Sequence, residues 1–394
     1  MRSTGYKGSW LAVSVPLPAL FPESPNFSID YPLLFVVVTL VLIGLVLIYA
    51  STYHLGFRYL KWQFLRALFG LGVLWFGTKI RVQRLGQKKV RLVLLLSTVG
   101  LMVVTLISGA ETGVVRRQLG IFQPQEFAKF ALIIYLAGYF SSLMEKDPQP
   151  GFVDSVVKPG AAVAVVVVLT LLQPAVGTSV LIGLSSLAVF ILAGVRWRYL
   201  LIPILTGIVL TTGVILALPI IRNTRYKYIP ERWDRFIAGD RYHQTQALIA
   251  LGSGGPIGRG LGEGRQKYYF LPKLHKDFIF CALGEEFGFA GCLFVMLLYA
   301  LFFLRALKIS ENTTTEFGKL LSAGIGVMIT LYSLVHIAVS LSIIPTTGQP
   351  LPFISYGGSA LVANLLAAGL ILNISRYRRS VVSGQWSAVR GYRF

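Results

Sequence analysis

The strongest constraint on the fold is a series of ten apolar stretches, because a helix needs about 20 apolar residues to cross a bilayer. They cover residues 32–52, 60–78, 90–108, 127–143, 160–172, 178–193, 199–220, 278–304, 320–343 and 359–374. Only 13% of the residues are charged, roughly half the share of a soluble domain. We therefore expect an all-α polytopic membrane protein with about ten transmembrane helices. The fifth and sixth stretches are short, and one kinked element is an alternative for this pair.

The distribution of Lys and Arg between the stretches predicts the orientation in the membrane, since short cytoplasmic loops are rich in these residues. Basic residues follow the second, sixth, eighth and tenth stretches, at 79–91, 196–198, 305–319 and 376–393. With ten spans, these segments share one side with the N-terminus. We expect a cytoplasmic segment at 1–30, a membrane domain at 31–376 and a basic cytoplasmic tail at 377–394. We expect no removable signal peptide in the first 30 residues.

A large connection between the seventh and eighth stretches, residues 221–277, is predicted to be extracytoplasmic. From 222 to 276 it carries eleven Lys or Arg residues against four acidic ones. Long loops escape the charge bias, so a tolerated exception is one interpretation, and a surface that grips an anion such as a pyrophosphate is the other. The net charge of +21 does not indicate nucleic acid, because the basic residues lie in short loops; anionic membrane lipid fits better.

A glycine-rich segment lies within this connection, from Gly252 to Gly264. Glycines allow backbone conformations that present successive N–H groups to an anion. Gln246 and Arg259 are candidate substrate-binding residues of this region. A flexible loop without a ligand is an equally weighted alternative.

Asp277 ends the connection, directly before the eighth stretch. Its carboxylate suits either the N-cap of the following helix or a catalytic base at the membrane surface. Three basic residues precede it and are candidate substrate-binding residues: Lys273, His275 and Lys276. Glu285 and Glu286 follow within the same predicted helix, where charges paired inside the bundle are at least as good an interpretation as a functional role.

Two further segments carry polar residues between apolar stretches. In Gln123–Lys129, Glu126 and Lys129 share a helix face and either form a structural ion pair or, with Arg117, a wall for a substrate phosphate. Residues 345–359 read PTTGQPLPFISYGGS and predict a rigid, non-helical outer loop. The structural residues of this loop are Pro352, Ser355, Gly357 and Gly358. His336, Cys281 and Cys292 are interpreted as packing residues.

The segments QPQEFAK at 123–129, FLPKLHKDFIFCALGEEFGFAG at 270–291 and PTTGQPLPFISYGGS at 345–359 together resemble the SEDS family of FtsW, RodA and SpoVE-like proteins. The resemblance runs from about 49 to 376. It implies a peptidoglycan glycosyltransferase that polymerises lipid II into β-1,4 glycan strands and releases undecaprenyl pyrophosphate. It assigns Asp277 as the catalytic base and places Glu126 and Lys129 in the family's QPSE motif. It also implies a location in the bacterial inner membrane, with an extracytoplasmic active site.

The partners that the resemblance implies are lipid II, undecaprenyl-linked glycan, a class B penicillin-binding protein that acts as transpeptidase, and other division or elongation membrane proteins. The sequence of the 345–359 segment favours the family members that act in cell division over those that act in elongation. A divalent cation, magnesium or manganese, is a candidate cofactor, although the sequence shows no cluster of metal ligands. A lipid II flippase and a non-catalytic scaffold for a transpeptidase are the alternative functions.

This chain departs from the family pattern at several positions. Gln125 replaces the serine of QPSE, and Ile121 stands where some members have an arginine that Arg116 or Arg117 would have to replace. Ala175 stands at the family's acidic position, and the common HTDF reads HKDF at 275–278, which places Lys276 beside the proposed base.

Overall fold

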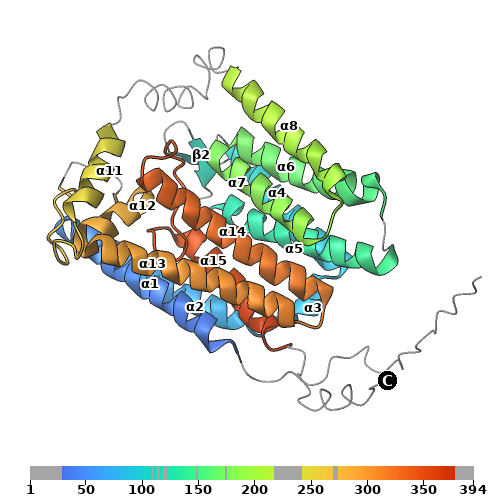
Figure 1. Cartoon of the computed structure of the whole chain (residues 1–394), viewed down its shortest axis with the longest axis horizontal. Helices are drawn as coiled ribbons and strands as arrows, with labels where there is room; N and C mark the ends of the chain where they lie inside the picture. The colour runs from blue at the N-terminus through green and yellow to red at the C-terminus, as the bar shows by residue number, and fades with distance from the viewer. Residues whose placement is uncertain are drawn as a thin grey trace, which may run out of the picture.

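The computed structural model describes residues 29–108, 110–112, 115–118, 122–147, 150–173, 175–216, 242–268 and 274–377. Over its described residues, each of the ten apolar stretches overlaps a helix (Figure 1). These helices are α1 (Tyr31–Thr52), α2 (Arg58–Gly77), α4 (Lys88–Ser108), α5 (Pro124–Lys146), α6 (Lys158–Leu172), α7 (Val176–Leu192), α8 (Trp197–Leu216), α13 (Ile279–Asn312), α14 (Glu316–Ser340) and α15 (Gly358–Ile374). The fifth and sixth stretches form two separate helices, so the single kinked element is wrong.

Short elements connect these helices. They are η1 (Tyr53–Leu55), α3 (Val82–Leu85), the π-helical turn η2 (Val153–Val157), α11 (Tyr242–Ser253), α12 (Leu274–Asp277) and the strands β1 (Ala110–Thr112) and β2 (Val115–Gln118). The two strands pair antiparallel, with Glu111 opposite Arg116. The predicted all-α fold did not include this hairpin, which is the one sheet in the described part of the chain.

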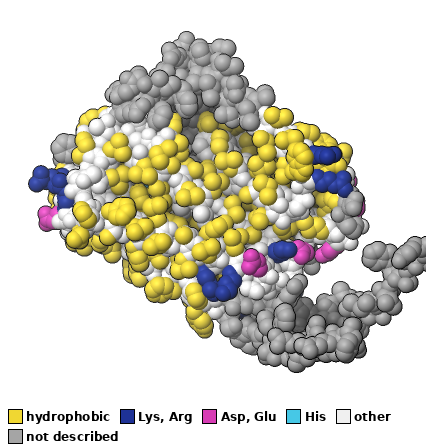
Figure 2. All heavy atoms as spheres, in the orientation of Figure 1, with side chains coloured by type: hydrophobic (Ala, Val, Ile, Leu, Met, Phe, Trp, Pro, Cys, Tyr) yellow, Lys and Arg dark blue, Asp and Glu magenta, His cyan; other side chains and the backbone are white. Residues whose placement is uncertain are grey.

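Several helices have the length and composition of membrane spans. Within the described residues, six helical segments meet both criteria: Tyr31–Leu55, Lys88–Ile107, Pro124–Lys146, Val153–Leu172, Ile279–Asn312 and Glu316–Ser340. Val176–Leu192 and Gly358–Ile374 are shorter apolar helices. Apolar side chains cover the middle of the visible face, and the charged ones gather toward its edges (Figure 2). This distribution is that of a membrane protein with several apolar helices.

Helix α14 lies at the centre of the bundle. It packs against α5, α7, α13 and α15, and α15 packs in turn along α2. The α2–α15 contact is close because glycines line it: a Cβ on Gly369 would lie 2.3 Å from the carbonyl oxygen of Leu74. Small residues allow helices to approach in this way within membranes.

The two ends of the bundle differ in their connections. One end holds η1, α11, α12 and the 345–357 segment, and the other holds α3 and the α13–α14 turn (Figure 1). At the second end, Arg305 forms an ion pair with Asp30 at 2.6 Å, and Ser375 accepts a hydrogen bond from the Asp30 backbone. We call this end the Asp30 end and the other the Asp277 end.

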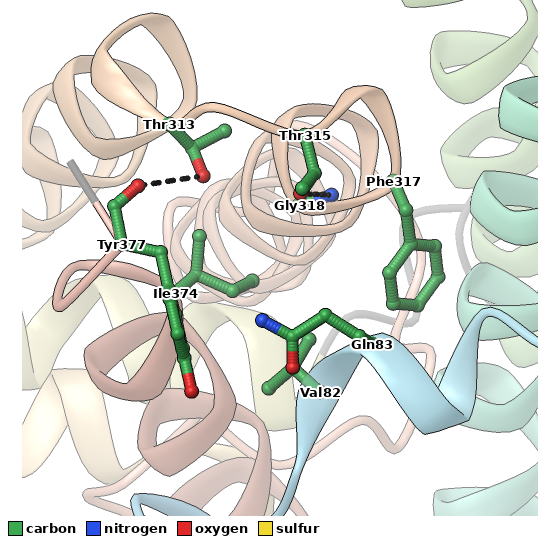
Figure 3. Close-up of a pocket in the computed structure, with 8 residues that line it drawn as sticks. All are labelled: Val82, Gln83, Thr313, Thr315, Phe317, Gly318, Ile374 and Tyr377. Carbon is green, nitrogen blue, oxygen red and sulfur yellow. Dashed lines mark hydrogen bonds between the residues drawn. The ribbon is translucent and has the colours of Figure 1, made fainter. Parts of the chain in front are cut away.

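A small pocket lies at the Asp30 end, between α3, the α13–α14 turn and the end of α15 (Figure 3). Thr315 caps α14 by accepting from the backbone of Gly318, and the Thr313 hydroxyl donates to the carbonyl of Tyr377. The basic segment 79–91 contacts the end of α15 here, since Asn373 donates to the carbonyl of Ile80. The pocket therefore belongs to the packing of this end, and the candidate site lies at the other.

Candidate functional site

Asp277 is the last residue of the short helix α12, and its side chain is half-buried. The N-cap of the next helix, α13, is Phe278. Asp277 is therefore not the N-cap of α13, which is the residue after it. The carboxylate stands at the junction of two helices, where α12 meets the long α13.

The 345–359 segment holds α12 in place. The Tyr356 backbone donates to the carbonyl of His275 at 3.0 Å, and the Ser355 hydroxyl donates to the carbonyl of Lys276 at 2.8 Å. The Ser355 oxygen also accepts from the backbone of Leu351 at 2.9 Å. Two segments that the sequence suggested separately thus meet, and both peptide carbonyls before Asp277 are fixed by hydrogen bonds.

The segment is non-helical up to Gly357, as predicted, and its residues are half-buried or buried. Pro352 and Ser355 are buried, and the Pro352 carbonyl accepts from the Tyr299 hydroxyl at 2.5 Å. Gly357 is the N-cap of α15, and Gly358 is its first residue. The protein covers this non-helical backbone, as a membrane environment requires.

A cluster of aromatic and basic side chains surrounds Tyr356, and we call it the Tyr356 cluster. The ring centroid of Tyr356 lies 5.5 Å from that of His275 and 5.4 Å from that of Tyr59. Two cations lie over the same ring, Arg66 at 4.9 Å and Lys276 at 5.7 Å from its centroid. These distances are those of cation–π contacts.

The protonation state of His275 follows from this packing. Burial, followed by the charge of Lys276, lowers the pKa of His275 from 6.5 to about 4. The imidazole is therefore neutral at pH 7. The cationic character of the site comes from Lys276, which is exposed, and from Arg66.

The glycine-rich segment has a structural role that the sequence did not suggest. Helix α13 is broken at Gly288, where φ is +66°. The segment bridges this break with four backbone bonds: Arg259 N to Glu285 O, Gly260 N to Glu286 O, Phe289 N to Gly255 O and Ala290 N to Pro256 O. The N–H groups of Arg259 and Gly260 are thus already used, which argues against the predicted phosphate cradle at these two positions.

Buried charges anchor the same segment. Glu285 accepts from the backbone N–H groups of Arg265, at 2.6 Å, and Gln266, at 3.3 Å. Lys267 lies 3.7 Å from the Glu286 carboxylate and donates to the carbonyls of Ala50 and Gly262. The interpretation of charges paired within the bundle holds for Glu286, which pairs with Lys267, whereas Glu285 is held by backbone N–H groups.

Glu126 and Lys129 form an ion pair of 2.7 Å on α5, and their side chains are only 1% and 4% exposed. Lys129 also lies 4.2 Å from the ring centroid of Tyr332. The structural alternative accounts for this arrangement, and contact of these two residues with substrate stays a prediction. His336 is packed as interpreted, with Nδ1 2.8 Å from the carbonyl oxygen of Gln349.

The other predicted site residues are separate from the Tyr356 cluster or lie outside the described residues. Gln246 is half-buried on α11, and the exposed side chain of Arg259 donates to the carbonyl of Ser253. Lys273 and the side chain of Arg117 lie outside the described part of the chain. Cys281 and Cys292 are free and buried.

The sequence interpretation missed Tyr59, Arg66 and Tyr356. A signal existed for Arg66, because it is the one charged residue between Lys61 and Lys79. An isolated charge inside a predicted span indicates a functional site. No spacing rule connects α2 with residue 356, so the cluster itself was not visible in the sequence.

No group of three His, Cys, Asp or Glu side chains gathers in the described parts of the chain. The residues at the Asp277 end therefore offer no donor set that would identify a divalent cation. The candidate magnesium or manganese cofactor stays a prediction.

Comparison with known proteins gives consistent matches along nearly the whole chain. The cell cycle protein family model of FtsW, RodA and SpoVE matches residues 31–380. A Geobacter sulfurreducens protein named probable peptidoglycan glycosyltransferase FtsW is 33% identical over 358 residues, which cover 88% of this chain and 95% of the relative. A Thiomicrospira cyclica protein of the same name is 34% identical over 374 residues, which cover 91% and 94%.

Two solved structures share the fold. The Thermus thermophilus rod shape determining protein RodA matches with a TM-score of 0.66 and 25% identity, over 89% of this chain and 98% of that one. A chain from a structure described as showing the coordination of polymerization and crosslinking by a peptidoglycan synthase complex matches with a TM-score of 0.73 and 25% identity. That match covers 90% of this chain and 100% of the other.

Proposed function

The chain belongs to the family of the cell cycle proteins FtsW, RodA and SpoVE, and from that premise we propose how it acts as a peptidoglycan glycosyltransferase in division or elongation. The proposed substrate is lipid II, which the enzyme joins into β-1,4 glycan strands. Asp277 is the catalytic base. The observation that carries this assignment is the position of Asp277, half-buried at a helix junction whose preceding carbonyls are held by the 345–359 segment.

The chemistry needs one proton acceptor and one stabilised leaving group. The Asp277 carboxylate takes the proton from the acceptor sugar hydroxyl, whose oxygen forms a bond to the anomeric carbon of the donor. The bond from that carbon to the diphosphate oxygen breaks, and undecaprenyl pyrophosphate leaves with the electron pair. Cations near the leaving group stabilise its developing charge. Lys276, which directly precedes Asp277 in the chain, is such a cation.

The neutral state of His275 suits this role of Asp277. A cation beside a carboxylate lowers its pKa and weakens it as a base. Because burial keeps His275 neutral at pH 7, Lys276 is the cationic neighbour in the α12 sequence that bears on Asp277. A half-buried, neutral imidazole thus limits the loss of basicity of Asp277.

Orientation and partners follow from the same proposal. The Asp277 end faces the outside of the inner membrane, and the Asp30 end, with both chain termini, faces the cytoplasm. The structural neighbour described as part of a peptidoglycan synthase complex supports a transpeptidase partner of the class B penicillin-binding type. The Glu126–Lys129 ion pair stabilises the start of α5. A divalent cation could help to neutralise the diphosphate, and no ligands are assigned to it.

Polymerisation of lipid II by the purified full chain with its transpeptidase partner tests the assignment. We expect glycan strands from the wild type and at least about a hundredfold loss of rate in Asp277→Asn. Glu263→Gln is the matched control, because Glu263 is an exposed carboxylate on the glycine-rich segment at the same end. Strands from Asp277→Asn at the wild-type rate would exclude the catalytic assignment. Transbilayer movement of lipid II without strands from any variant would indicate the flippase, and neither activity would indicate the scaffold.

A further inference from the structure

Two cations converge on one aromatic ring that packs against α12, the helix that ends at Asp277. Arg66, from α2, and Lys276, from α12, both lie over Tyr356, at 4.9 and 5.7 Å from its ring centroid. Tyr356 is fixed by the backbone hydrogen bond from its N–H to the carbonyl of His275. The ring therefore defines where the two charges sit relative to α12.

Arg66 lies within α2, the helix that covers the apolar stretch 60–78, which the sequence predicts to be a membrane span. It is eight residues from the start of α2, which places it about 12 Å along the helix axis. The described residues form ion pairs at five places, and Arg66 takes part in none of them. Arginines within membrane-spanning helices are costly and usually pair with an anion or line a ligand site.

The start of α15 adds to the positive potential at Arg66. The guanidinium packs against Gly358, where an added Cβ would lie 3.1 Å from Arg66 Nε. Gly358 is the first residue of the 17-residue helix α15, and no side chain caps this helix at Gly357. A helix N-terminus carries a partial positive charge. It repels the guanidinium of a neighbouring arginine unless an anion binds to both.

We propose that Arg66 and Lys276, held by Tyr356, bind the diphosphate of the lipid-linked sugar donor at the start of α15. A guanidinium offers two parallel N–H donors to phosphate oxygens, and Lys276 adds an exposed second charge. The site rests on the proposed function and extends it, because it adds Arg66 and Tyr356 and places the leaving group beside Asp277. Because Gly358 has no side chain, the Arg66 guanidinium can pack directly against the start of α15.

Binding measurements with the full chain in nanodiscs test this site without any need for catalysis. All proteins carry Asp277→Asn, and the probes are undecaprenyl diphosphate and, as the phospholipid source of a phosphate group, phosphatidylglycerol. We expect Arg66→Gln to weaken undecaprenyl diphosphate binding by about tenfold or more, the effect of losing about 1.4 kcal/mol. Arg58→Gln is the matched control, since Arg58 is an exposed arginine at the start of the same helix, and we expect a change below about twofold.

A second substitution separates loss of the site from loss of folding. Gly358→Ala keeps the Arg66 charge but places a methyl group where the guanidinium packs, so it should also weaken binding. Arg66→Gln with the same affinity as Arg58→Gln, or a loss seen with phosphatidylglycerol alone, overturns the proposal. If binding depends on Arg66 but the wild type makes no glycan, the proposed function fails while the diphosphate site stands.

Discussion

At the residue scale, Ser355 joins the 345–359 segment to α12, directly before Asp277, the proposed catalytic base. Its hydroxyl donates to the carbonyl of Lys276 and accepts from the N–H of Leu351, and the side chain is 4% exposed. A buried hydroxyl with two partners is sensitive to deletion, because each partner then loses its hydrogen bond.

We therefore expect Ser355→Ala to lower the free energy of unfolding by about 1–3 kcal/mol. It should also lower kcat by about tenfold or more, since small displacements of a catalytic group are costly. Ser97→Ala is the control, because the exposed Ser97 bonds only to Val93 of its own helix. Thermal unfolding and polymerisation at a temperature well below unfolding measure the two effects. A Ser355→Ala enzyme with wild-type kcat would show that Ser355 only stabilises the fold.

The lowered pKa of His275 predicts how the free energy of unfolding changes with pH. In the unfolded chain its pKa is about 6.5, and in the folded protein burial lowers it to about 4. Between these values the unfolded state binds more protons, so the free energy of unfolding falls as the pH drops from 6.5 toward 4. The contribution of the neutral ring is complete above pH 6.5.

His275→Gln should therefore be less stable than the wild type at pH 7.5, by a margin that narrows as the pH is lowered to 5. The melting temperatures of both proteins across this range give the difference directly. A constant margin would mean that His275 titrates near its ordinary pKa in the folded state.

At the element scale, the apolar stretches predicted the helices well because bilayer thickness and side-chain hydropathy are local properties of the chain. The site was predicted only in part. Asp277 and Ser355 lie in recognisable segments, whereas the contact of Tyr356 with Arg66 depends on how α2 packs along α15. The glycine-rich segment looked like a phosphate loop because glycine pattern alone does not reveal which N–H groups the fold already uses.

The break in α13 shows how strongly two elements depend on each other. Gly288 has φ of +66°, and a Cβ there would lie 2.3 Å from the backbone nitrogen of Gly258. The glycine-rich segment replaces the helical hydrogen bonds that this break removes. A side chain at 288 would therefore disturb both the helix and the segment.

We expect Gly288→Ala to cost roughly 1–3 kcal/mol from the backbone conformation alone, with the steric clash added. Gly100→Ala, in α4, should be neutral or stabilising by up to about 1 kcal/mol, because nothing lies within 4 Å of the added methyl group. Thermal unfolding in detergent compares the two. Equal melting temperatures would mean that the segment and the kink do not support each other.

At the scale of the whole molecule, the Asp30 end holds a buried ion pair that is remote from the proposed catalytic site. The 22 residues of α1 separate the ends by about 33 Å. At the Asp30 end, Arg305 makes two hydrogen bonds to the Asp30 carboxylate, which is 1% exposed. This ion pair joins the start of α1 to α13, and Ser375 adds α15.

Arg305→Gln should lower the free energy of unfolding by roughly 2–3 kcal/mol, since it leaves the buried carboxylate of Asp30 without its cation. Its kcat should stay at the wild-type value at temperatures well below unfolding, because α12 and the 345–359 segment make their contacts at the other end. Asp277→Asn should show the opposite pattern, with glycan synthesis lost and the melting temperature nearly unchanged. Lys308→Gln, an exposed cation on the same helix as Arg305, should change neither quantity. A fall in kcat in Arg305→Gln would mean that the packing of α1 and α13 transmits changes at the Asp30 end along the bundle to Asp277.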